Sequence, residues 1–456
     1  MSGNTALQEL FDGCGAARLV AQGSTYSATA LHHGANDWAR AFRRAGVARG
    51  DRIICALPNG AAFVQLLVAA LADGVTLAPV PEHTDVVPLL ELLDARIAIT
   101  SVSTHPHVAV PSKTGGPPSA PLVPRPTRTR SDHVAFLLRT SGTSGAARWI
   151  ALSETNVLSV LQSHLPQMAL DGASVLCILP WFHAFGLILG LLPALLRARV
   201  IVAEPDAVRD ASTLIAFASQ HATSHLSMVP LTASRLAATD DGLALLRTLQ
   251  SGLVGGAPID AYLAAVLTTT KLRVGYGQTE ASPGIMLGYP GEFRENLLGR
   301  PLGCDVRVDD DGVLAFKGPN ACAGFWEEGV LIPLEDDRWQ RTGDIVTVSG
   351  GVYTFVGRAS LSFKLQNGRI VNAPLIEHAL RSRCVRVTDV VVVPTSAHRV
   401  NLIYSTYDGQ DVAPADIAHA LGGVQSYLGA VVRVPLDAWT RTPKGDIDRS
   451  KLPELP

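Results

Sequence analysis

The feature that most constrains the fold is a regular alternation of short apolar runs and amphipathic segments near the start of the chain. The run RIICALP, within residues 50–58, is apolar without strict alternation, which is typical of a strand covered on both faces. Residues 25–47 and 61–75 carry the apolar spacing of helices, and residues 76–80 form a second short strand. This order of elements predicts an α/β fold.

Length and composition set the class of protein. The chain has 456 residues, of which 47% are hydrophobic and 17% charged, so a large core and more than one domain are expected. The formal net charge of −2 excludes the strong basic bias of nucleic-acid-binding proteins. The six cysteines are scattered without a C-x-x-C pair, which favours neither a zinc site nor a disulfide framework. Together with the lack of a secretory pattern in residues 1–23, this favours a cytoplasmic protein.

One stretch is long and apolar enough to suggest a membrane span. Residues 172–196 contain no Asp, Glu, Lys or Arg. Pro180, His183 and Pro193 interrupt the run, and such breakers favour a buried strand over residues 174–180 followed by a buried helix over 186–196. We therefore expect no membrane span.

The pattern changes along the chain in a way that indicates domains. Residues 103–130 are rich in Pro, Ser, Thr and Gly and predict a long loop. The region 299–356 is strand-rich with glycine turns, and the last hundred or so residues resemble a separate α+β unit. We predict a large N-terminal domain, residues 1–358, with two doubly covered sheets and a β-rich subdomain. A small, mobile C-terminal lid domain, residues 359–456, follows it.

The first motif with chemical meaning lies in residues 138–148, LRTSGTSGAAR, directly after an apolar strand-like run. Every residue from Thr140 to Gly145 is Gly, Ser or Thr. Glycines let a backbone wrap around an anion, and hydroxyl and N–H groups supply donors. The spacing is not that of a Walker loop, and composition alone leaves an ordinary flexible turn open.

This segment resembles the phosphate loop T-S-G-T-T-G-x-P-K-G of the adenylate-forming superfamily, which includes acyl- and aryl-CoA synthetases. Ser144, Ala147 and Arg148 stand for the Thr, Pro and Lys of that pattern, which keeps the hydroxyl and the positive charge. Further segments similar to the family's motifs follow in its order. They are residues 255–258 (GGAP), 275–280 (GYGQTE), 299–301 (GRP), 318–319 (GP), 341–344 (RTGD), 357–358 (GR) and 367–377.

The resemblance implies a function. The chain would activate a carboxylic acid with ATP and Mg²⁺, form an acyl-AMP and release pyrophosphate. It would then pass the acyl group to the thiol of CoA or of an acyl carrier protein. The ATP- and AMP-binding residues implied by the resemblance are Thr140, Ser141, Gly142, Thr143, Ser144, Gly145, Arg148, Gly255, Gly256, Ala257, Tyr276, Gly277, Thr279, Asp344 and Arg358.

Each implied residue suits its role chemically. Tyr276 offers a flat face to adenine, Thr279 a donor to the α-phosphate, and Glu280 a hard oxygen ligand to Mg²⁺. Asp344 can accept hydrogen bonds from the ribose hydroxyls. Taken alone, Tyr276 could equally be a core tyrosine, Glu280 a surface carboxylate and Asp344 a turn residue. The catalytic residues implied are Thr140, Thr279, Glu280 and Lys444, with Glu280 as the metal ligand.

The acid-binding region is implied by residues 180–186, PWFHAFG, which resemble the family's P-x-F-H-x-x-G segment. The resemblance implies that His183 lines the acid pocket, although a lone His in an apolar run is often a core residue. The other implied acid-binding residues are Gly255, Gly277 and Gln278. Because the Asp that holds an amino-acid ammonium group is missing here, we expect a hydrophobic or aromatic acid without an α-amine.

The sequence departs from the family near its C-terminal signature T-P-x-G-K-[IV]-x-R. Residues 442–449 read TPKGDIDR, so Asp446 stands where the family has its catalytic lysine, and Lys444 is the candidate replacement. Ser360 and Glu154 also depart from the pattern. Two alternatives remain open. One is an ATP-dependent amide or ester synthetase of natural-product biosynthesis, and the other is a degenerate nucleotide-binding member without turnover.

Overall fold

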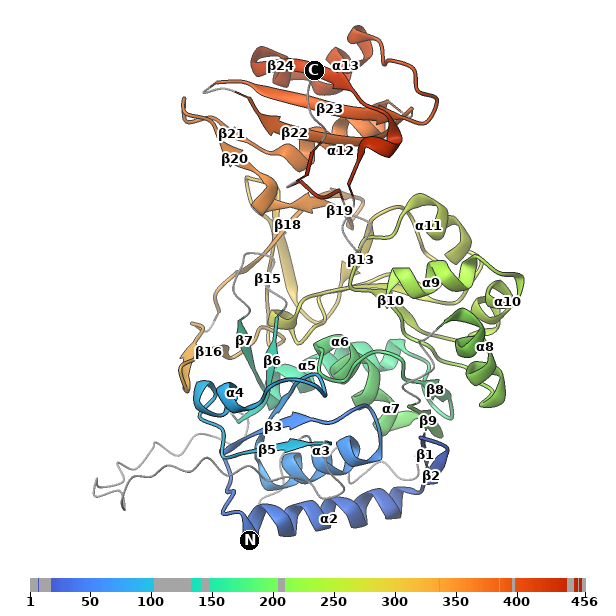
Figure 1. The fold of residues 1–456 in the computed structure, drawn as a ribbon, viewed down its shortest axis with the longest axis vertical. Coiled ribbons are helices and arrows are strands. Elements are labelled where there is room, and N and C mark those ends of the chain that lie inside the picture. The colour runs from blue at the N-terminus through green and yellow to red at the C-terminus, as the bar shows by residue number, and fades with distance from the viewer. Residues whose placement is uncertain are drawn as a thin grey trace, which may run out of the picture. The chain divides into compact units, whose positions relative to one another are not determined.

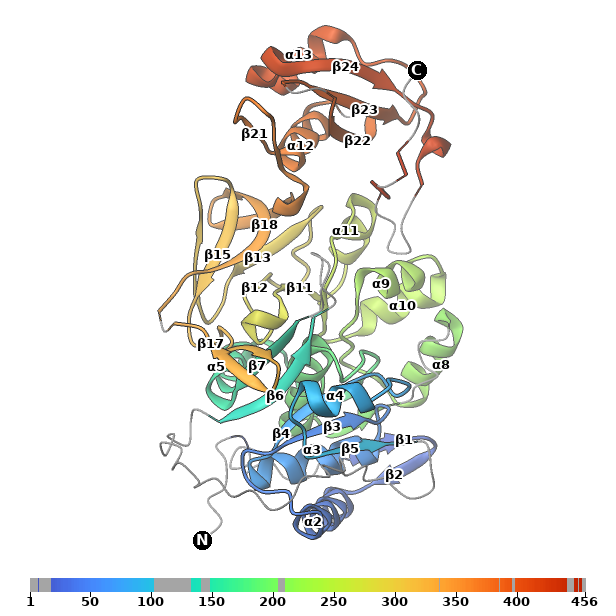
Figure 2. The ribbon, with the colours of Figure 1, turned by 60° about the vertical axis from the view of Figure 1, so that its left-hand side comes forward.

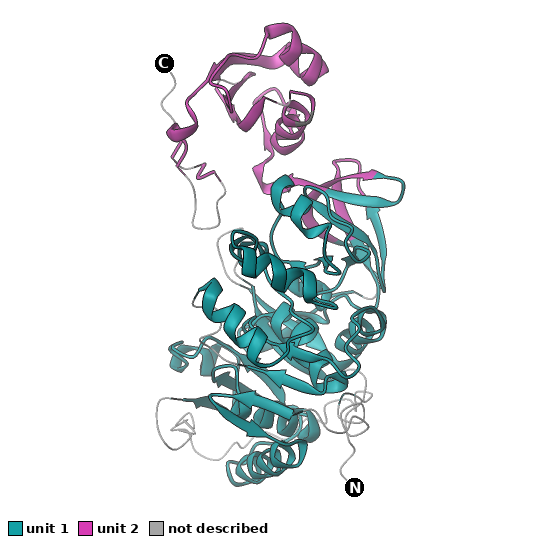
Figure 3. Ribbon diagram, turned by 90° about the vertical axis from the view of Figure 1, so that its right-hand side faces the viewer, with its two compact units in different colours: residues 1–307, 316–340, 349–354 teal, residues 308–315, 341–348, 355–456 magenta. Residues whose placement is uncertain are grey.

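The computed structural model describes residues 7, 18–101, 133–140, 148–203, 210–335, 337–384, 386–395, 398–440, 447–449 and 451–452. The segment 103–130, predicted as a loop, lies outside these residues. The chain divides into two compact units (Figure 3). Unit 1 comprises residues 1–307, 316–340 and 349–354, and unit 2 comprises residues 308–315, 341–348 and 355–456. The domain boundary at residue 358 stays a prediction.

Unit 1 contains a seven-stranded sheet in the order β17-β16-β7-β6-β4-β3-β5 (Figure 1). Neighbours among β3, β4, β5 and β6 pair in parallel, whereas β7, β16 and β17 are antiparallel additions at one edge. The strands are β3 (Arg52–Ala56), β4 (Thr76–Pro79), β5 (Ile97–Thr100), β6 (Val134–Arg139), β7 (Trp149–Ser153), β16 (Gly324–Glu327) and β17 (Val330–Pro333).

Helices cover both faces of this sheet, as the apolar, non-alternating strands predict. Ile53 of β3 belongs to a core that includes Phe42 of α2 and Phe63 of α3. The next residue, Ile54, belongs to a second core with Leu89 of α4. The helices around the sheet are α2 (Ala28–Arg44), α3 (Ala61–Asp73), α4 (Val87–Leu92) and α5 (Glu154–His164), and η2 (Leu165–Gln167) follows α5.

Local sequence explains where these helices begin and end. Ser27 caps α2 by accepting a hydrogen bond from the Ala30 amide at 3.1 Å. α3 ends at Gly74, whose φ of 65° is the left-handed conformation that glycine adopts without strain. Ser153 and Asn156 form a reciprocal capping box at the start of α5. The helices predicted over residues 25–47 and 61–75 are thereby confirmed, with shorter ends.

A second core of unit 1 lies between a four-stranded sheet, β2-β1-β9-β8, and the helices α8 to α11 (Figure 1 and Figure 2). The strands β10 and β11 contribute Val254 and Val274 to this core. The elements are β1 (Arg18–Ala21), β2 (Ser24–Tyr26), β8 (Ser174–Leu176), β9 (Val200–Val202), β10 (Leu253–Gly255), β11 (Arg273–Tyr276), β12 (Met286–Leu287), β13 (Leu297–Pro301), α8 (Ala211–Gln220), α9 (Pro230–Ala237), α10 (Asp240–Thr248), α11 (Ala261–Leu267) and η5 (Thr279–Ala281).

The apolar stretch 172–196 differs in detail from the expectation. The strand predicted over 174–180 ends at Leu176, because Asn59 binds the Leu179 carbonyl and the Trp181 amide and turns the chain away. The helix predicted over 186–196 consists of α6 (Ala184–Gly186), a π-helical turn η3 (Leu187–Leu191) and α7 (Leu192–Arg197). Among the helices in the described part of the chain, none has the length and hydropathy needed to cross a membrane.

Unit 2 contains a three-stranded sheet, β22-β23-β24, with α12 and α13 packed into one apolar core around Leu380 and Leu402. Its elements are η6 (Ala359–Leu361), β20 (Phe363–Lys364), β21 (Ile370–Val371), α12 (Ala373–Arg383), β22 (Val387–Pro394), β23 (Val400–Thr406), α13 (Pro414–Leu421), η7 (Gly422–Tyr427), β24 (Leu428–Arg433) and η8 (Leu436–Ala438). The division between the units passes through β14 (Asp305–Val308), β15 (Val313–Lys317), β18 (Gln340–Ser349) and β19 (Val352–Arg358).

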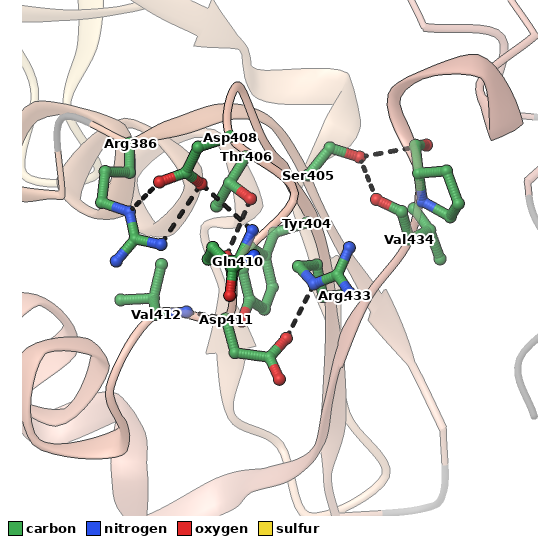
Figure 4. A network of polar contacts seen from close by, with 11 residues as sticks. Arg386, Tyr404, Ser405, Thr406, Asp408, Gln410, Asp411, Val412, Arg433 and Val434 are labelled. Atoms are coloured by element: carbon green, nitrogen blue, oxygen red, sulfur yellow. Dashed lines mark hydrogen bonds and ion pairs between the residues drawn. The ribbon is translucent and has the colours of Figure 1, made fainter.

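Polar contacts fix the chain after β23 (Figure 4). Arg386 pairs with Asp408 at 2.8 Å, and Arg433 pairs with Asp411 at 2.7 Å. The Tyr404 hydroxyl accepts a hydrogen bond from the Val412 amide, which lies just before α13. These ion pairs join the segment after β23 to Arg386, just before β22, and to Arg433 at the end of β24. The small unit therefore has polar contacts of its own besides its apolar core.

Candidate active site

The two ends of the predicted phosphate loop are hydrogen-bonded to each other where β6 ends and β7 begins. Thr140 follows β6 and Arg148 precedes β7, and these two strands pair antiparallel up to Arg139 opposite Trp149. The Thr140 amide donates to the Arg148 carbonyl at 2.9 Å, and the Arg148 amide donates to Thr140 Oγ1 at 3.3 Å. The interior of the loop, with Ser141, Gly142, Thr143, Ser144 and Gly145, lies outside the described residues.

A second group of predicted residues follows two neighbouring parallel strands. Gly255, the last residue of β10, lies opposite Gly275 of β11, so the segments 255–257 and 276–280 leave the sheet side by side. The carboxyl ends of adjacent parallel strands are the usual place for a ligand in an α/β fold. The predicted residues Gly256, Ala257 and Tyr276 all lie at this edge.

Backbone packing at this edge explains its glycines. A Cβ on Gly255 would lie 2.3 Å from the Gly275 carbonyl oxygen, and one on Gly277 would lie 1.4 Å from the Pro283 carbonyl oxygen. No side chain fits at either position. The glycines therefore let the two segments approach closely, and Gly277 brings Gln278 and Thr279 against the turn that follows.

Glu280 lies in the short helix η5, and a hydrogen bond from a segment that is distant in the sequence fixes its main chain. The Glu280 carbonyl accepts a hydrogen bond from the Cys322 amide at 2.8 Å. The pKa of the Cys322 thiol is raised to about 12, chiefly by burial and also by the Glu280 carboxylate, while the Arg148 guanidinium acts in the opposite direction. Phe325, three residues after Cys322, lies against the Arg148 guanidinium. The segment 322–325 therefore contacts both the predicted phosphate-loop cation and the residue predicted to bind the metal, all within unit 1.

His183 is exposed at the start of α6, after a turn that is tied to the seven-stranded sheet. Asn59, just after β3, donates to the Leu179 carbonyl at 2.9 Å and accepts from the Trp181 amide at 3.0 Å. The rings of Phe182 and His183 lie 4.5 Å apart, tilted by 52°. The exposed ring of His183 does not fit the alternative of a core histidine.

Unit 2 brings two predicted nucleotide-binding residues together. Asp344 of β18 is 3% exposed, and its carboxylate pairs with Arg358, the last residue of β19, at 2.8 Å. The Asp344 amide donates to Thr342 Oγ1 at 3.0 Å, which fixes the local turn. An ionised carboxylate can accept several hydrogen bonds, so the ion pair with Arg358 does not by itself exclude other donors.

Lys444 and Asp446 lie outside the described residues, but the chain on both sides of them is anchored. The Asp448 amide donates to the Thr440 carbonyl at 2.8 Å. Arg449 pairs with the buried Glu377 of α12 at 2.6 Å. Burial raises the pKa of the Glu377 carboxyl, and Arg449 acts in the opposite direction.

Glu280 suits a metal that is shared with a nucleotide. Among the described residues, no group of three or more His, Cys, Asp or Glu side chains is placed to hold a metal ion. Mg²⁺ in nucleotide enzymes needs only one or two protein carboxylates, since phosphate oxygens and waters complete its coordination. A single carboxylate in η5, the short helix that contacts β7, fits that requirement.

Sequence reasoning missed the residues that hold the site together. Asn59 ties down the turn before His183, and Phe325 of β16 lies under the Arg148 guanidinium with 3.7 Å from the guanidinium carbon to the ring centroid. Neither contact leaves a signal in the sequence, because each joins segments that are distant along the chain.

The chain is similar to known proteins in sequence and in fold. The model of the AMP-binding enzyme family matches residues 12–326. The chain is 28% identical over 364 residues to the feruloyl-CoA synthase of Amycolatopsis sp., covering 70% of each protein. It is 24% identical over 431 residues to the medium-chain fatty-acid–CoA ligase of Escherichia coli, covering 83% of this chain and 75% of the relative. Wild-type E. coli MenE with a bound phenylether-linked analogue of OSB-AMS superposes with a TM-score of 0.75 at 19% identity, over 97% of this chain and 98% of that one.

The chain belongs to the AMP-binding enzyme family. It is an AMP-forming acid–thiol ligase, which activates a carboxylic acid as its acyl adenylate. The structural likeness confirms the predicted α/β architecture with several sheets.

Proposed function

We propose that this enzyme activates a hydrophobic or aromatic carboxylic acid and transfers the acyl group to CoA. The observation that carries the proposal is the convergence of Thr140 and Arg148 with Glu280 around residues 322–325. A cation and hydroxyl at the base of a Gly/Ser-rich loop suit a triphosphate, and the nearby carboxylate suits its magnesium.

Adenylation follows from these groups. The acid carboxylate attacks the α-phosphorus of ATP in line, the new O–P bond forms, and pyrophosphate leaves. Thr279 and the loop donors hydrogen-bond the phosphate oxygens, and Arg148 offsets their negative charge. Mg²⁺ held by Glu280 would neutralise charge on the triphosphate. Lys444 is proposed to bring the two anions together, and Asp344 and Arg358 to bind the ribose and the nucleotide.

Transfer is the second half-reaction. The sulfur of the acceptor attacks the acyl carbonyl, the thioester bond forms, AMP leaves, and the thiol proton is released. The two CoA ligases among the relatives support CoA as the acceptor. An acyl carrier protein offers the same pantetheine thiol.

Support for an apolar acid comes from the surroundings of His183. Residues 172–196 contain no Asp, Glu, Lys or Arg, so this part of the chain offers no carboxylate to an ammonium group. The relatives act on an aromatic acid in one case and on fatty acids in the other, as their names state. We propose that His183, Gly255, Gly277 and Gln278 contact the acid.

Pyrophosphate release over a panel of aryl, fatty and amino acids, with and without CoA, tests the proposal. We expect release with aryl or medium-chain acids, and thioester formation with CoA. Glu280→Gln should abolish Mg²⁺-dependent release, whereas Glu295→Gln, on an exposed glutamate of the same unit, should not. Normal release by a folded Glu280→Gln variant would refute the assignment of the metal ligand.

A further inference from the structure

The segment 322–325 contacts three parts of the proposed nucleotide site. The Cys322 amide holds the Glu280 carbonyl at 2.8 Å, and the Ala323 amide holds the Ala151 carbonyl of β7 at 2.9 Å. The ring of Phe325 lies under the guanidinium of Arg148. One short run of residues is therefore tied to the segment that carries the metal ligand, to the strand after the phosphate loop, and to the cation at the base of that loop.

The position of Phe325 is fixed by the sheet. Phe325 pairs with Ile150 of β7 and Ile332 of β17, so β16 is hydrogen-bonded on both sides. A Cβ on the preceding Gly324 would lie 2.2 Å from the Ile332 carbonyl oxygen, so the strands meet there without a side chain between them. The half-buried Phe325 ring consequently presents a fixed surface beside the first residues of β7.

Arg148, in contrast, is exposed and follows a Gly/Ser-rich stretch. A free arginine side chain loses considerable rotamer entropy when it binds a phosphate. A planar guanidinium stacks on an aromatic face, which is geometry that a lysine ammonium does not share. A guanidinium already held against a ring has less freedom to lose.

We propose that Phe325 is a positioning residue for nucleotide binding, which acts by stacking under the Arg148 guanidinium and holding it ready for the triphosphate. This inference rests on the proposed function, since it takes Arg148 as a phosphate ligand. It adds to that function a residue of β16 that is far from the phosphate loop in sequence.

The test is a double-mutant cycle read out by ATP binding in calorimetry and by KM for ATP and for the acid. Phe325→Leu should weaken ATP binding by about 2- to 30-fold, the range of exposed to desolvated cation–π contacts. KM for the acid should not change, and Phe325→Tyr should behave as the wild type. In an Arg148→Ala background, Phe325→Leu should have no further effect. Tyr289→Leu removes a comparable stack on Arg300, at 4.4 Å, and serves as the matched control.

Two results would overturn the inference while leaving Arg148 as a phosphate ligand. The first is a Phe325→Leu effect on ATP binding that is equal with and without Arg148. The second is wild-type ATP binding by Phe325→Leu while Arg148→Ala binds poorly. If Arg148→Ala itself binds ATP as tightly as the wild type, the assignment of Arg148 as a phosphate ligand fails, and this inference fails with it. Phe325→Met replaces the leucine variant if the latter lowers the melting temperature.

Discussion

Replacement of Asp344 by Asn probes the proposed ribose contact with little change of shape. The carboxylate is 3% exposed and pairs with Arg358 at 2.8 Å. Asn keeps one acceptor and removes the charge. Hydrogen bonds to charged groups contribute about 1.5–3 kcal/mol, so ATP binding should weaken by about 10- to 150-fold. The fold should survive, because Arg358 is exposed enough to be solvated when its partner is lost.

Calorimetry with ATP and with 2′,3′-dideoxy-ATP separates the ribose contact from other effects. The wild type should prefer ATP, and Asp344→Asn should lose most of that preference. Asp309→Asn removes a carboxylate that pairs with Arg341 at 3.1 Å in the same unit, and is the matched control. Equal weakening for both nucleotides, or an unchanged dissociation constant, would refute the reasoning.

Two further predictions concern Lys444 and the buried histidines. Lys444→Ala should slow pyrophosphate release by about 100-fold or more while leaving transfer from a supplied acyl adenylate nearly unchanged. Asp446→Lys should speed adenylation, because it removes a negative charge that would repel the two reacting anions. Unchanged rates in both variants would contradict these roles. Burial lowers the pKa of His164 and of His225 to about 4, so stability should be complete above pH 6.5 and fall by up to about 3 kcal/mol per histidine as the pH drops toward 4. Urea unfolding at pH 7.5 and pH 4.5 checks this: His225→Gln should flatten the loss, the exposed His32→Gln should not, and a pH-independent wild type would disprove it.

Local signals explain the part of the fold that the sequence could predict. The helix α2 has its Ser27 cap, α3 has its Gly74 stop, and the non-alternating strand β3 is buried on both faces. The π-helical turn Leu187–Leu191 could not be foreseen, because an apolar run reads the same in an α- and a π-helical segment.

The candidate site divides in the same way. Glycine spacing and family resemblance pointed to Gly255 and Gly277, and backbone packing accounts for their lack of a side chain. The contacts of Asn59 and Phe325 depend on tertiary structure alone. A single asparagine after a strand or a phenylalanine in an edge strand carries no pattern that distinguishes it from its neighbours.

The most direct test of the central claim is the fate of carboxylate oxygen. The enzyme would be incubated with ATP, Mg²⁺, CoA and an accepted acid labelled with ¹⁸O in its carboxyl group, and the products examined by mass spectrometry. Attack of the carboxylate on the α-phosphorus predicts transfer of label to AMP when the acyl group leaves for the thiol. Label in inorganic phosphate with none in AMP, or in neither product while thioester forms, would contradict an acyl-adenylate intermediate.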